Sequence, residues 1–504
     1  MSVILRPYQE ATIASLRAAI RAGKRRIMTT IPTGGGKTIT SAALIRSALQ
    51  RGTRCMFVAH RKELIDQTVR TFLRLGVTNI GVIRAGDKRR NPSAPLQIAS
   101  IQTLARRTQD GEFGVIVIDE AHRAIAKSYV THIFERHPRA IIIGLSATPI
   151  RSDGRPLGSH FDELVIGARY SELIEAGAIV APRVYSTPIL PDLSEVRTSG
   201  GDYNLEDLEA AVNKGALIGN LLHEWQKHPR QRTVVFAVSV RHSLAIVDMF
   251  RSAGVAAEHL DGTTPEPERE AILARLESGD TQVVSNVGVL CEGWDMPSCK
   301  TLILACPTKS LSKYMQMAGR ILRPWEGVTP IVLDHGGNVD RHGLPHIDRE
   351  WSLDVKPKRT REAPTKVCKG CYAYVPAGTK KCPYCDHVFE EQPELPIEPP
   401  KKEEIPIDLA LRTLETDGGA DAAKLRYFRD LHRKCRERGW KLGAVIYRFE
   451  ARFSEPPPKS WIDALKADWR RDREWKERIR ERQRRIAEEE AKAQALAMFD
   501  EVAP

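Results

Sequence analysis

The sequence predicts two tandem α/β domains, each a parallel sheet flanked by helices, followed by a small cysteine-rich module and a helical C-terminal region. Its 504 residues are too many for a single hydrophobic core. Short β-branched runs alternate with helical patterns over residues 1–182 and again over 183–345, which is typical of parallel sheets. Beyond residue 345, lysine, arginine and proline become frequent, and four cysteines lie within residues 368–385.

The expected strands of both α/β domains are short runs of β-branched and other apolar residues. In the first domain the runs are "RRIMTTI" (25–31), "CMFVAH" (55–60), "LQIASI" (96–101), "VIVIDE" (115–120) and "AIIIGLSAT" (140–148). In the second domain they are "RTVVFAVS" (232–239), "AAEHLDG" (256–262), "TQVVSNVGV" (281–289), "CKTLILAC" (299–306) and "TPIVLDHGG" (329–337). This order is that of two successive doubly wound domains.

The formal net charge of +13 favours an anionic partner, with nucleic acid as the leading candidate, although a general contribution to solubility is an alternative. No run of 18 apolar residues occurs, and the N-terminal "MSVILRPYQE" has no basic region followed by an apolar one. We therefore expect neither a membrane span nor a secretory signal, and a cytoplasmic location.

A glycine-rich stretch, "MTTIPTGGGKTITSAALIRSAL" (28–49), joins an expected strand to an expected helix. Glycines allow backbone N–H groups to surround phosphate oxygens, and the helix N-terminus adds its dipole. The lysine would reach the β and γ phosphates of a nucleotide, and the next hydroxyl would bind Mg²⁺. The candidate residues are Thr33, Gly34, Gly35, Gly36, Lys37 and Thr38. The strict pattern has a glycine five residues before Gly36, where this chain has Ile31, so a simple glycine-rich turn is the alternative.

Two adjacent carboxylates, Asp119 and Glu120, follow the apolar run 115–118. Ligands of open parallel sheets bind outside the carboxyl ends of the strands, so the pair is expected beside the glycine-rich loop. In nucleotide motors one carboxylate at this place holds Mg²⁺, usually through water, and the next orients and deprotonates the attacking water. We assign the first role to Asp119 and the second to Glu120.

"DEAH" at 119–122, together with "PTGGGKT" at 32–38, resembles the DEAD/DEAH-box superfamily-2 helicases and translocases. The resemblance implies two RecA-like domains that bind ATP between them and move along nucleic acid. It extends over about residues 4–340, where further motifs of the family follow in order: "RPYQ" (6–9), "VAHRKELIDQ" (58–67), "IASIQTL" (98–104), "SAT" (146–148), "VVFAVSVRHS" (234–243), "VVSNVGVLCEGWDMP" (283–297) and "QMAGRILRP" (316–324).

The resemblance also implies roles for single residues in these motifs. Gln9 would contact the adenine edge with its amide, and Gly293 and Asp295 would meet the ribose and the domain interface. The candidate arginine fingers are Arg320 and Arg323, which would make hydrolysis depend on domain closure. His122 would contact Gln316 of the last motif, and a plain histidine at a helix start is the alternative.

The segment "VCKGCYAYVPAGTKKCPYCDHVF" (367–389) contains two C-x2-C pairs separated by ten residues. Thiolate pairs at this spacing converge on one metal and predict a closed, structural Zn²⁺ site, a zinc ribbon over residues 367–390, with the ligands Cys368, Cys371, Cys382 and Cys385. The loop between the pairs has few apolar residues, so we expect the metal to replace a core. A redox dithiol is the alternative.

A motor followed by such a ribbon is similar to the RadD-like bacterial and phage DNA helicases, through "LRPYQ", "AHRKEL", "LDHGGN" and the cysteines. That similarity weakens in the last hundred residues.

The remaining segments are a basic linker (346–366), a Pro- and charge-rich spacer (391–406) and a helical region (407–504). Aromatic residues of the helical region alternate with basic ones and either contact nucleic acid or form a small core: Tyr427, Phe428, Trp440, Tyr447 and Phe449. The stretch "QALAMFDE" (494–501) faintly resembles peptides that bind bacterial sliding clamps, through Gln494, Leu496, Met498 and Phe499. A frayed helix end is the alternative.

Together these patterns predict an ATP-dependent motor acting on DNA, most readily single-stranded or forked, with ATP, Mg²⁺ and structural Zn²⁺ as cofactors. Its setting would be DNA repair, recombination or phage replication. The alternatives are a nucleotide-switched DNA-binding or recruitment protein that does not unwind, an RNA helicase, and the motor subunit of a restriction enzyme, for which no nuclease motif is found. Motor motifs contact the nucleic-acid backbone and therefore do not distinguish DNA from RNA.

Overall fold

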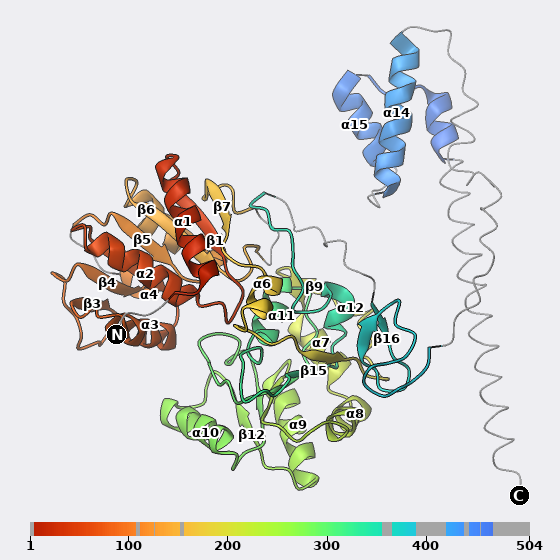
Figure 1. Ribbon diagram of the computed structural model, residues 1–504. Coiled ribbons are helices and arrows are strands. Elements are labelled where there is room, and N and C mark those ends of the chain that lie inside the picture. The colour runs from red at the N-terminus through yellow and green to blue at the C-terminus, as the bar shows by residue number, and fades with distance from the viewer. Residues whose placement is uncertain are drawn as a thin grey trace, which may run out of the picture. The chain divides into compact units, whose positions relative to one another are not determined.

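The computed structural model describes residues 5–106, 111–124, 126–151, 156–354, 365–389, 420–437, 443–453 and 455–466. The chain forms two compact units, residues 1–390 and 391–504. The first unit contains two α/β domains and the cysteine-rich segment (Figure 1).

The first domain is a seven-stranded sheet in the order β3-β4-β2-β5-β6-β1-β7, with every neighbouring pair parallel. Its strands are β1 (Arg26–Thr30), β2 (Cys55–Ala59), β3 (Ile80–Ile83), β4 (Leu96–Ser100), β5 (Val115–Ile118), β6 (Ile141–Ser146) and β7 (Glu163–Ile166). Its helices are α1 (Pro7–Arg21), α2 (Lys37–Leu49), α3 (Lys62–Arg74), α4 (Ile101–Leu104), η1 (Ala121–Arg123), α5 (Lys127–Tyr129), η2 (Val130–Glu135) and α6 (Tyr170–Glu175). The carboxyl ends of these strands lie along one edge, where such sheets bind ligands.

Apolar side chains bury this sheet on both faces. Along β2, the side chains of Cys55, Phe57 and Ala59 join one core, whereas Met56 and Val58 join the other. Successive side chains of a strand point to opposite faces, so a strand covered on both sides needs an unbroken apolar run. The apolar runs of the sequence therefore correspond to a sheet packed between two layers of helices.

The second domain is a six-stranded, fully parallel sheet in the order β12-β13-β11-β14-β15-β8. Its strands are β8 (Arg183–Tyr185), β11 (Thr233–Phe236), β12 (Ala257–Leu260), β13 (Val283–Asn286), β14 (Thr301–Leu304) and β15 (Ile331–Asp334). Its helices are α7 (Leu205–Val212), α8 (Gly215–Gln226), α9 (Val240–Ser252), α10 (Glu266–Ser278), α11 (Leu311–Ala318) and α12 (Asn338–His342), and a small antiparallel pair, β9 (Thr198–Ser199) and β10 (Asp202–Tyr203), precedes α7. The two sheets confirm the predicted fold class.

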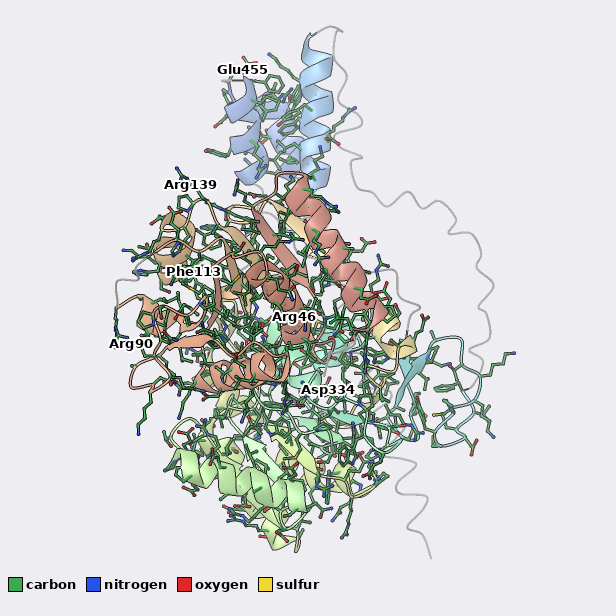
Figure 2. The ribbon with its side chains drawn as sticks, turned by 60° about the vertical axis from the view of Figure 1, so that its left-hand side comes forward. Arg46, Arg90, Phe113, Arg139, Asp334 and Glu455 are labelled. Atoms are coloured by element: carbon green, nitrogen blue, oxygen red, sulfur yellow. The ribbon has the colours of Figure 1, made fainter. Side chains whose placement is uncertain are left out.

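Figure 2 draws the described side chains and labels Arg90 and Arg139 on the first domain and Asp334 on the second. Arg90 and Arg139 are exposed on the first domain, whereas Asp334 is buried at the end of β15. The carboxylate of Asp334 accepts the backbone N–H groups of Gly336 and Val339, at 3.2 and 2.7 Å. These hydrogen bonds fix the turn from β15 into α12.

The cysteine-rich segment forms a hairpin of β16 (Thr365–Val367) and β17 (Tyr374–Pro376) that packs against the second domain. Ala373 pairs with Tyr185 of β8, and the Tyr372 carbonyl accepts the Ser186 N–H at 2.8 Å. Ala373 and Val375 are buried in the same core as Tyr185. The expectation that metal replaces a core in this segment is therefore wrong, because the segment shares the core of the domain.

The second unit contains α14 (Ala420–Glu437), α15 (Gly443–Phe453) and a short helix over 459–466. Phe428, Phe449 and Trp461 are buried against one another, with ring centres 5.6 to 6.1 Å apart, and Tyr427 packs beside them. Of the two alternatives for these aromatics, the small core is the one present, although Tyr447 is 72% exposed. Trp440, the 391–406 spacer and the clamp-like peptide (494–501) lie outside the described residues.

Among the residues that the structure describes, no helix is long and apolar enough to cross a membrane.

Candidate active site

The glycine-rich loop lies between the carboxyl end of β1 and the start of α2 at Lys37. Gly34 and Gly36 have φ angles of 91° and 80°, a left-handed conformation that favours glycine. A Cβ added at Gly35 would lie 2.6 Å from the Cγ2 atom of Ile31. Ile31, the departure from the strict pattern, is fully buried and packs beneath the loop. A side chain at this position thus supports the turn from within the core.

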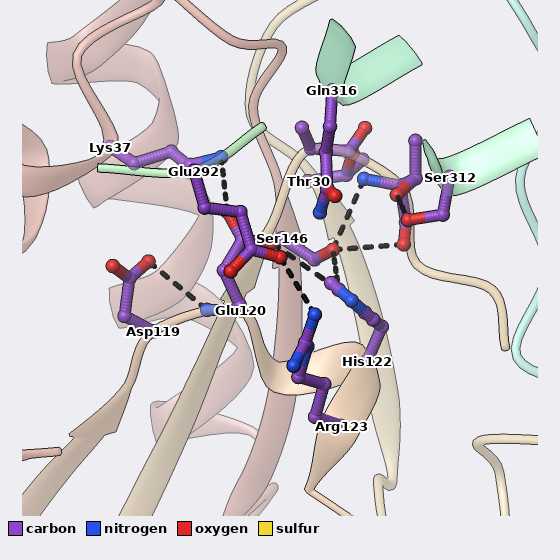
Figure 3. Close-up of polar contacts among 12 residues, drawn as sticks. Thr30, Lys37, Asp119, Glu120, His122, Arg123, Ser146, Glu292, Ser312 and Gln316 are labelled. Atoms are coloured by element: carbon purple, nitrogen blue, oxygen red, sulfur yellow. Dashed lines mark hydrogen bonds and ion pairs between the residues drawn. The ribbon is translucent and has the colours of Figure 1, made fainter. Parts of the chain in front are cut away.

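Asp119 and Glu120 lie at the carboxyl end of β5, close to this loop (Figure 3). The Lys37 Nζ atom is 3.4 Å from Glu120 Oε1, and the Glu120 N–H donates to Asp119 Oδ1 at 3.1 Å. Glu120 has a φ of 49°, a left-handed conformation that is strained for a glutamate. This turn directs the two carboxylates from one strand end into the same space.

Their pKa values move in opposite directions. Burial alone would raise the pKa of Glu120, but the charge of Lys37 and the hydrogen bond from His122 hold it below its ordinary value. Burial and the adjacent charge of Glu120 raise the pKa of Asp119. Glu120 is therefore the ionised member beside the lysine. A divalent cation in front of Asp119 would favour its ionised form as well.

A cleft of about 330 Å³ lies between the two domains at these residues. Of the predicted site residues it is lined by Thr33, Gly34, Gly36, Lys37, Thr38, Asp119, Glu120, Gly293, Asp295, Arg320 and Arg323. Cationic donors, two hydroxyls and three carboxylates thus converge from both domains. This donor set fits a nucleoside triphosphate with a divalent cation, held by Thr38 and Asp119.

Arg320 and Arg323 reach the cleft in different ways. Arg320 donates to the carbonyls of Trp294 at 2.7 Å and Gln316 at 3.2 Å. Arg323 forms an ion pair with Asp295 instead. Gly319, directly before Arg320, touches the glycine-rich loop so closely that an added Cβ would lie 2.6 Å from the Cβ of Thr33. The last motif of the second domain is therefore in direct contact with the first domain.

Gln9 and Gln316 do not line the cleft. The Gln9 amide donates to the Gly35 carbonyl at 3.4 Å and accepts the Arg6 N–H at 3.0 Å, so it braces the loop from behind. Gln316 is buried, and its amide nitrogen has no hydrogen-bond partner.

His122 is hydrogen-bonded differently from the expectation. Its Nδ1 atom lies 3.1 Å from Ser146 Oγ and 3.3 Å from Glu120 Oε2, and no hydrogen bond joins it to Gln316 among the described residues. Ser146 Oγ accepts the Thr148 N–H, and Thr148 Oγ1 is 2.7 Å from Ser312 Oγ on α11. The link from His122 to the second domain therefore passes through "SAT" and Ser312. His122 and Gln316 line the same cavity, and their expected contact stays a prediction.

Glu292 was not singled out by the sequence. It follows β13 in the second domain, its side chain is 3% exposed, and it binds three side chains of the first domain. Its carboxylate oxygens lie 2.6 Å from His60 Nε2, 3.1 Å from Arg61 Nε and 2.8 Å from Arg123 Nη2. Burial would raise the pKa of Glu292, but His60 and Arg123 lower it to about 2. The only feature of the sequence that could have indicated Glu292 is its position, as a charged residue next to Gly293 within the motif.

The four cysteine Sγ atoms of the hairpin all lie within 4.8 Å of one another. Two of the pairs, Cys368–Cys385 and Cys371–Cys382, are 3.6 and 3.7 Å apart. A tetrahedral Zn²⁺ site with Zn–S bonds of about 2.3 Å has S–S edges of about 3.8 Å. Tyr372 and Asp386, which each follow the second cysteine of a pair, have φ angles of 60° and 61° and close two equivalent knuckles. The residues present thus fit a closed zinc site.

Two family models match the chain. The model described as "Type III restriction enzyme, res subunit" matches residues 2–151, and "Helicase conserved C-terminal domain" matches residues 213–324. The chain is a superfamily-2 helicase. This family consists of nucleic-acid-dependent ATPases that use ATP and, as a rule, Mg²⁺. The sequence-based assignment to the superfamily is confirmed, whereas the narrower similarity to RadD-like helicases stays a prediction.

The helicase is 30% identical over 366 residues to a 51.5 kDa protein of Lactococcus phage (isolate 7-9), covering 71% of this chain and 77% of the phage protein. It is 30% identical over 340 residues to the putative ATP-dependent helicase IRC3 of Saccharomyces cerevisiae, covering 64% of this chain and 49% of the yeast protein. The chain thus spans most of the phage relative but about half of the yeast one.

The solved structure of the ATP-dependent Type ISP restriction-modification enzyme LlaBIII bound to DNA superposes on the helicase with a TM-score of 0.52 at 18% identity. The match covers 66% of this chain and 28% of that enzyme, and it shows a shared fold.

Proposed function

We propose that this helicase hydrolyses ATP between its two domains and uses closure and opening of the cleft to move along or unwind DNA. The observation that supports this most strongly is the convergence of Lys37, Asp119 and Glu120 from one domain with Arg320 from the other in a single cleft. A site completed by both domains makes hydrolysis depend on their closure.

Each side chain of the cleft would have a role in ATP binding or hydrolysis that follows from its chemistry. Lys37 would bind the β and γ phosphates, and Glu120, kept ionised, would orient the attacking water and accept its proton. Arg320 would stabilise the negative charge that develops on the transferred phosphoryl group, while Arg323 and Asp295 would act as a pair at the interface. Thr38 and Asp119 would hold Mg²⁺, which supplies charge neutralisation at the phosphates.

Three observations support DNA as the track. The net charge of +13 suits a polyanion, LlaBIII is bound to DNA in its solved structure, and a phage protein is among the relatives. DNA repair, recombination or phage replication would be the setting. We assign ATP binding to residues 1–182, the second motor domain to 183–345, a linker to 346–366 and a structural Zn²⁺ site to 367–390.

Steady-state ATP hydrolysis, measured without nucleic acid and with single-stranded DNA, duplex DNA or single-stranded RNA, tests the proposal. Stimulation by DNA is expected, and Lys37→Ala and Glu120→Gln should lower turnover by about 10³-fold or more, because each removes a contact to the reacting groups. Normal turnover in either variant would refute the assigned site. Stimulation by RNA alone would identify an RNA helicase, and a rate indifferent to every nucleic acid would favour the nucleotide switch.

A further inference from the structure

A second cavity, of about 480 Å³, adjoins the ATP cleft between the two domains. Glu292 lines both spaces. His122 lines the second cavity and lies 3.3 Å from Glu120, which lines the first. The side chain of His122 therefore lies between the second cavity and Glu120, the residue that would activate water.

The lining of the second cavity is strongly basic. Arg61, Arg123, Arg151 and Lys313 contribute four cations, and Glu292 is the only acid among the described residues that line it. Glu292 is itself engaged by Arg61, Arg123 and His60. The Lys313 Nζ atom also lies 3.9 Å from Asp202 Oδ2. Four cations therefore face two carboxylates, and the remaining positive excess suits a small anion.

Gln316 adds a neutral donor to this lining. Its side chain is 5% exposed, its Nε2 atom has no hydrogen-bond partner, and it extends from α11 towards the strand ends of the first domain (Figure 3). A buried N–H group without an acceptor is destabilising, so this position of Gln316 suits a ligand that accepts a hydrogen bond. An oxyanion in the cavity would provide that acceptor.

We infer that this second cavity is a phosphate-oxyanion site that receives the inorganic phosphate released by ATP hydrolysis. The inference rests on the proposed function. In an in-line displacement the phosphoryl group moves away from ADP and towards the attacking water. That water would lie beside Glu120, so the phosphate moves towards His122 and Gln316. ADP still blocks the glycine-rich loop at this stage, and the basic cavity is the adjoining space.

The rim of the cavity is open to solvent. The side chains of Arg61, Lys313 and Arg123 are 30%, 34% and 46% exposed. These cations can therefore hold phosphate weakly and let it leave, without displacing the nucleotide on the other side of Glu120.

Inhibition of steady-state ATPase activity by added inorganic phosphate tests the inference. Phosphate at the γ-phosphate position of the nucleotide-free cleft competes with ATP, whereas phosphate in the second cavity can bind together with ATP or ADP. Phosphate that rebinds at the γ-phosphate position beside ADP also persists at saturating ATP, but it does not depend on Lys313. We expect inhibition that persists at saturating ATP in the wild type. In Lys313→Met the inhibition constant should rise roughly threefold to fivefold, as for loss of one partly exposed charge contact, and Lys313→Arg should restore it.

Lys309→Met is the matched control. It removes the same charge four residues earlier, close to the same Asp202, but Lys309 stacks on Tyr203 and does not line the cavity. Its phosphate inhibition should equal that of the wild type.

Three outcomes would overturn the inference: inhibition fully relieved by ATP in the wild type, equal effects of Lys309→Met and Lys313→Met, or a Lys313→Met variant with weaker DNA affinity and unchanged phosphate inhibition. The last would assign Lys313 to the nucleic-acid backbone. A wild type with no ATPase activity on any nucleic acid would overturn the proposed function and this inference together. The three outcomes above would overturn this inference alone, so the two failures are distinguishable.

Discussion

At the level of single residues, Arg320 and Arg323 differ in what holds them. Arg320 is held by two backbone carbonyls and keeps its charge towards the cleft, whereas Arg323 is neutralised by Asp295. We expect Arg320→Ala to lower kcat by about 10³-fold with little change in ATP affinity.

Arg323→Ala and Asp295→Ala should each lower kcat less than Arg320→Ala does. The double variant Arg323→Ala/Asp295→Ala should lose less activation free energy than the sum of the two single losses, because Arg323 and Asp295 share one interaction. Single-turnover hydrolysis and a double-mutant cycle measure this. Equal, additive losses at all three positions would contradict it.

Glu292 gives the closed arrangement a defined pH dependence. Its pKa of about 2 in the folded protein lies below the ordinary value of about 4.3, so folding favours its ionised form. This contribution to stability is complete above about pH 5 and is lost as the pH falls through about 4 towards 2. Glu292→Gln should therefore melt below the wild type at pH 7, with a difference that shrinks on acidification.

Thermal melting at pH 7, 5 and 3.5 checks the Glu292 prediction. Glu266→Gln is the control, because Glu266 also pairs across the domains, with Lys62, but its side chain is 56% exposed. An exposed pair contributes little, so this control should melt close to the wild type. A Glu292→Gln deficit that does not change with pH would contradict the assigned cause.

The candidate site was largely predictable because motifs mark strand ends. Lys37 and Glu120 lie after β1 and β5, and parallel strands deliver their carboxyl ends to one edge whatever the length of chain between them. The partners of Glu292 were not predictable in this way. His60 and Arg123 meet it only because two domains approach, and no spacing in the sequence encodes that approach.

At the level of secondary-structure elements, we predict the effect of losing the metal ligands of the cysteine hairpin. Cys382→Ser, or removal of metal by a chelator, should abolish zinc binding and loosen β16 and β17, because the four thiolates close both knuckles. Since Ala373 and Val375 lie in the core around Tyr185, the second domain should melt earlier too. ATP binding should persist, because the cleft is lined by other residues.

Zinc content, thermal melting and binding of a fluorescent ATP analogue measure these effects. Lys369→Met, which changes an exposed residue of the first knuckle without touching a ligand, is the control. Loss of nucleotide binding ahead of any change in melting would contradict a structural role for the metal.

The fold itself followed from the sequence at the level of strands, while the placing of the hairpin did not. Buried runs such as β5 identify themselves by β-branched residues. The segment around Ala373 has too few apolar residues to predict a hydrophobic core from its sequence. It is buried because it pairs with the edge strand β8 of the second domain. A shared core of that kind depends on tertiary contact alone.

At the scale of the whole molecule, one glycine allows a close contact between the two domains. An added Cβ at Gly319 would lie 2.6 Å from the Thr33 Cβ, closer than van der Waals contact allows. Gly319→Ala should therefore hold the domains apart and lower ATPase turnover at least about tenfold, while each domain keeps its melting temperature. Thr33→Gly in the same chain should relieve the clash.

Gly219→Ala is the matched control for Gly319→Ala. Gly219 lies within α8, and an added Cβ there would meet nothing within 4 Å. Alanine in an open helical position should stabilise the protein slightly, by up to about 1 kcal/mol, and leave turnover unchanged. Wild-type turnover in Gly319→Ala would show that the close contact is not needed.

The hairpin has one more consequence, for how copies of the protein behave towards each other. β8 is the last strand of its sheet, and on its outer side Tyr185 pairs with Ala373 while the Ser186 N–H donates to the Tyr372 carbonyl. Unpaired N–H and C=O groups on such a margin are templates for the strands of other molecules. The knuckle that would hold Zn²⁺ thus also shields this margin, and loss of that metal would make the chains prone to self-association through β8.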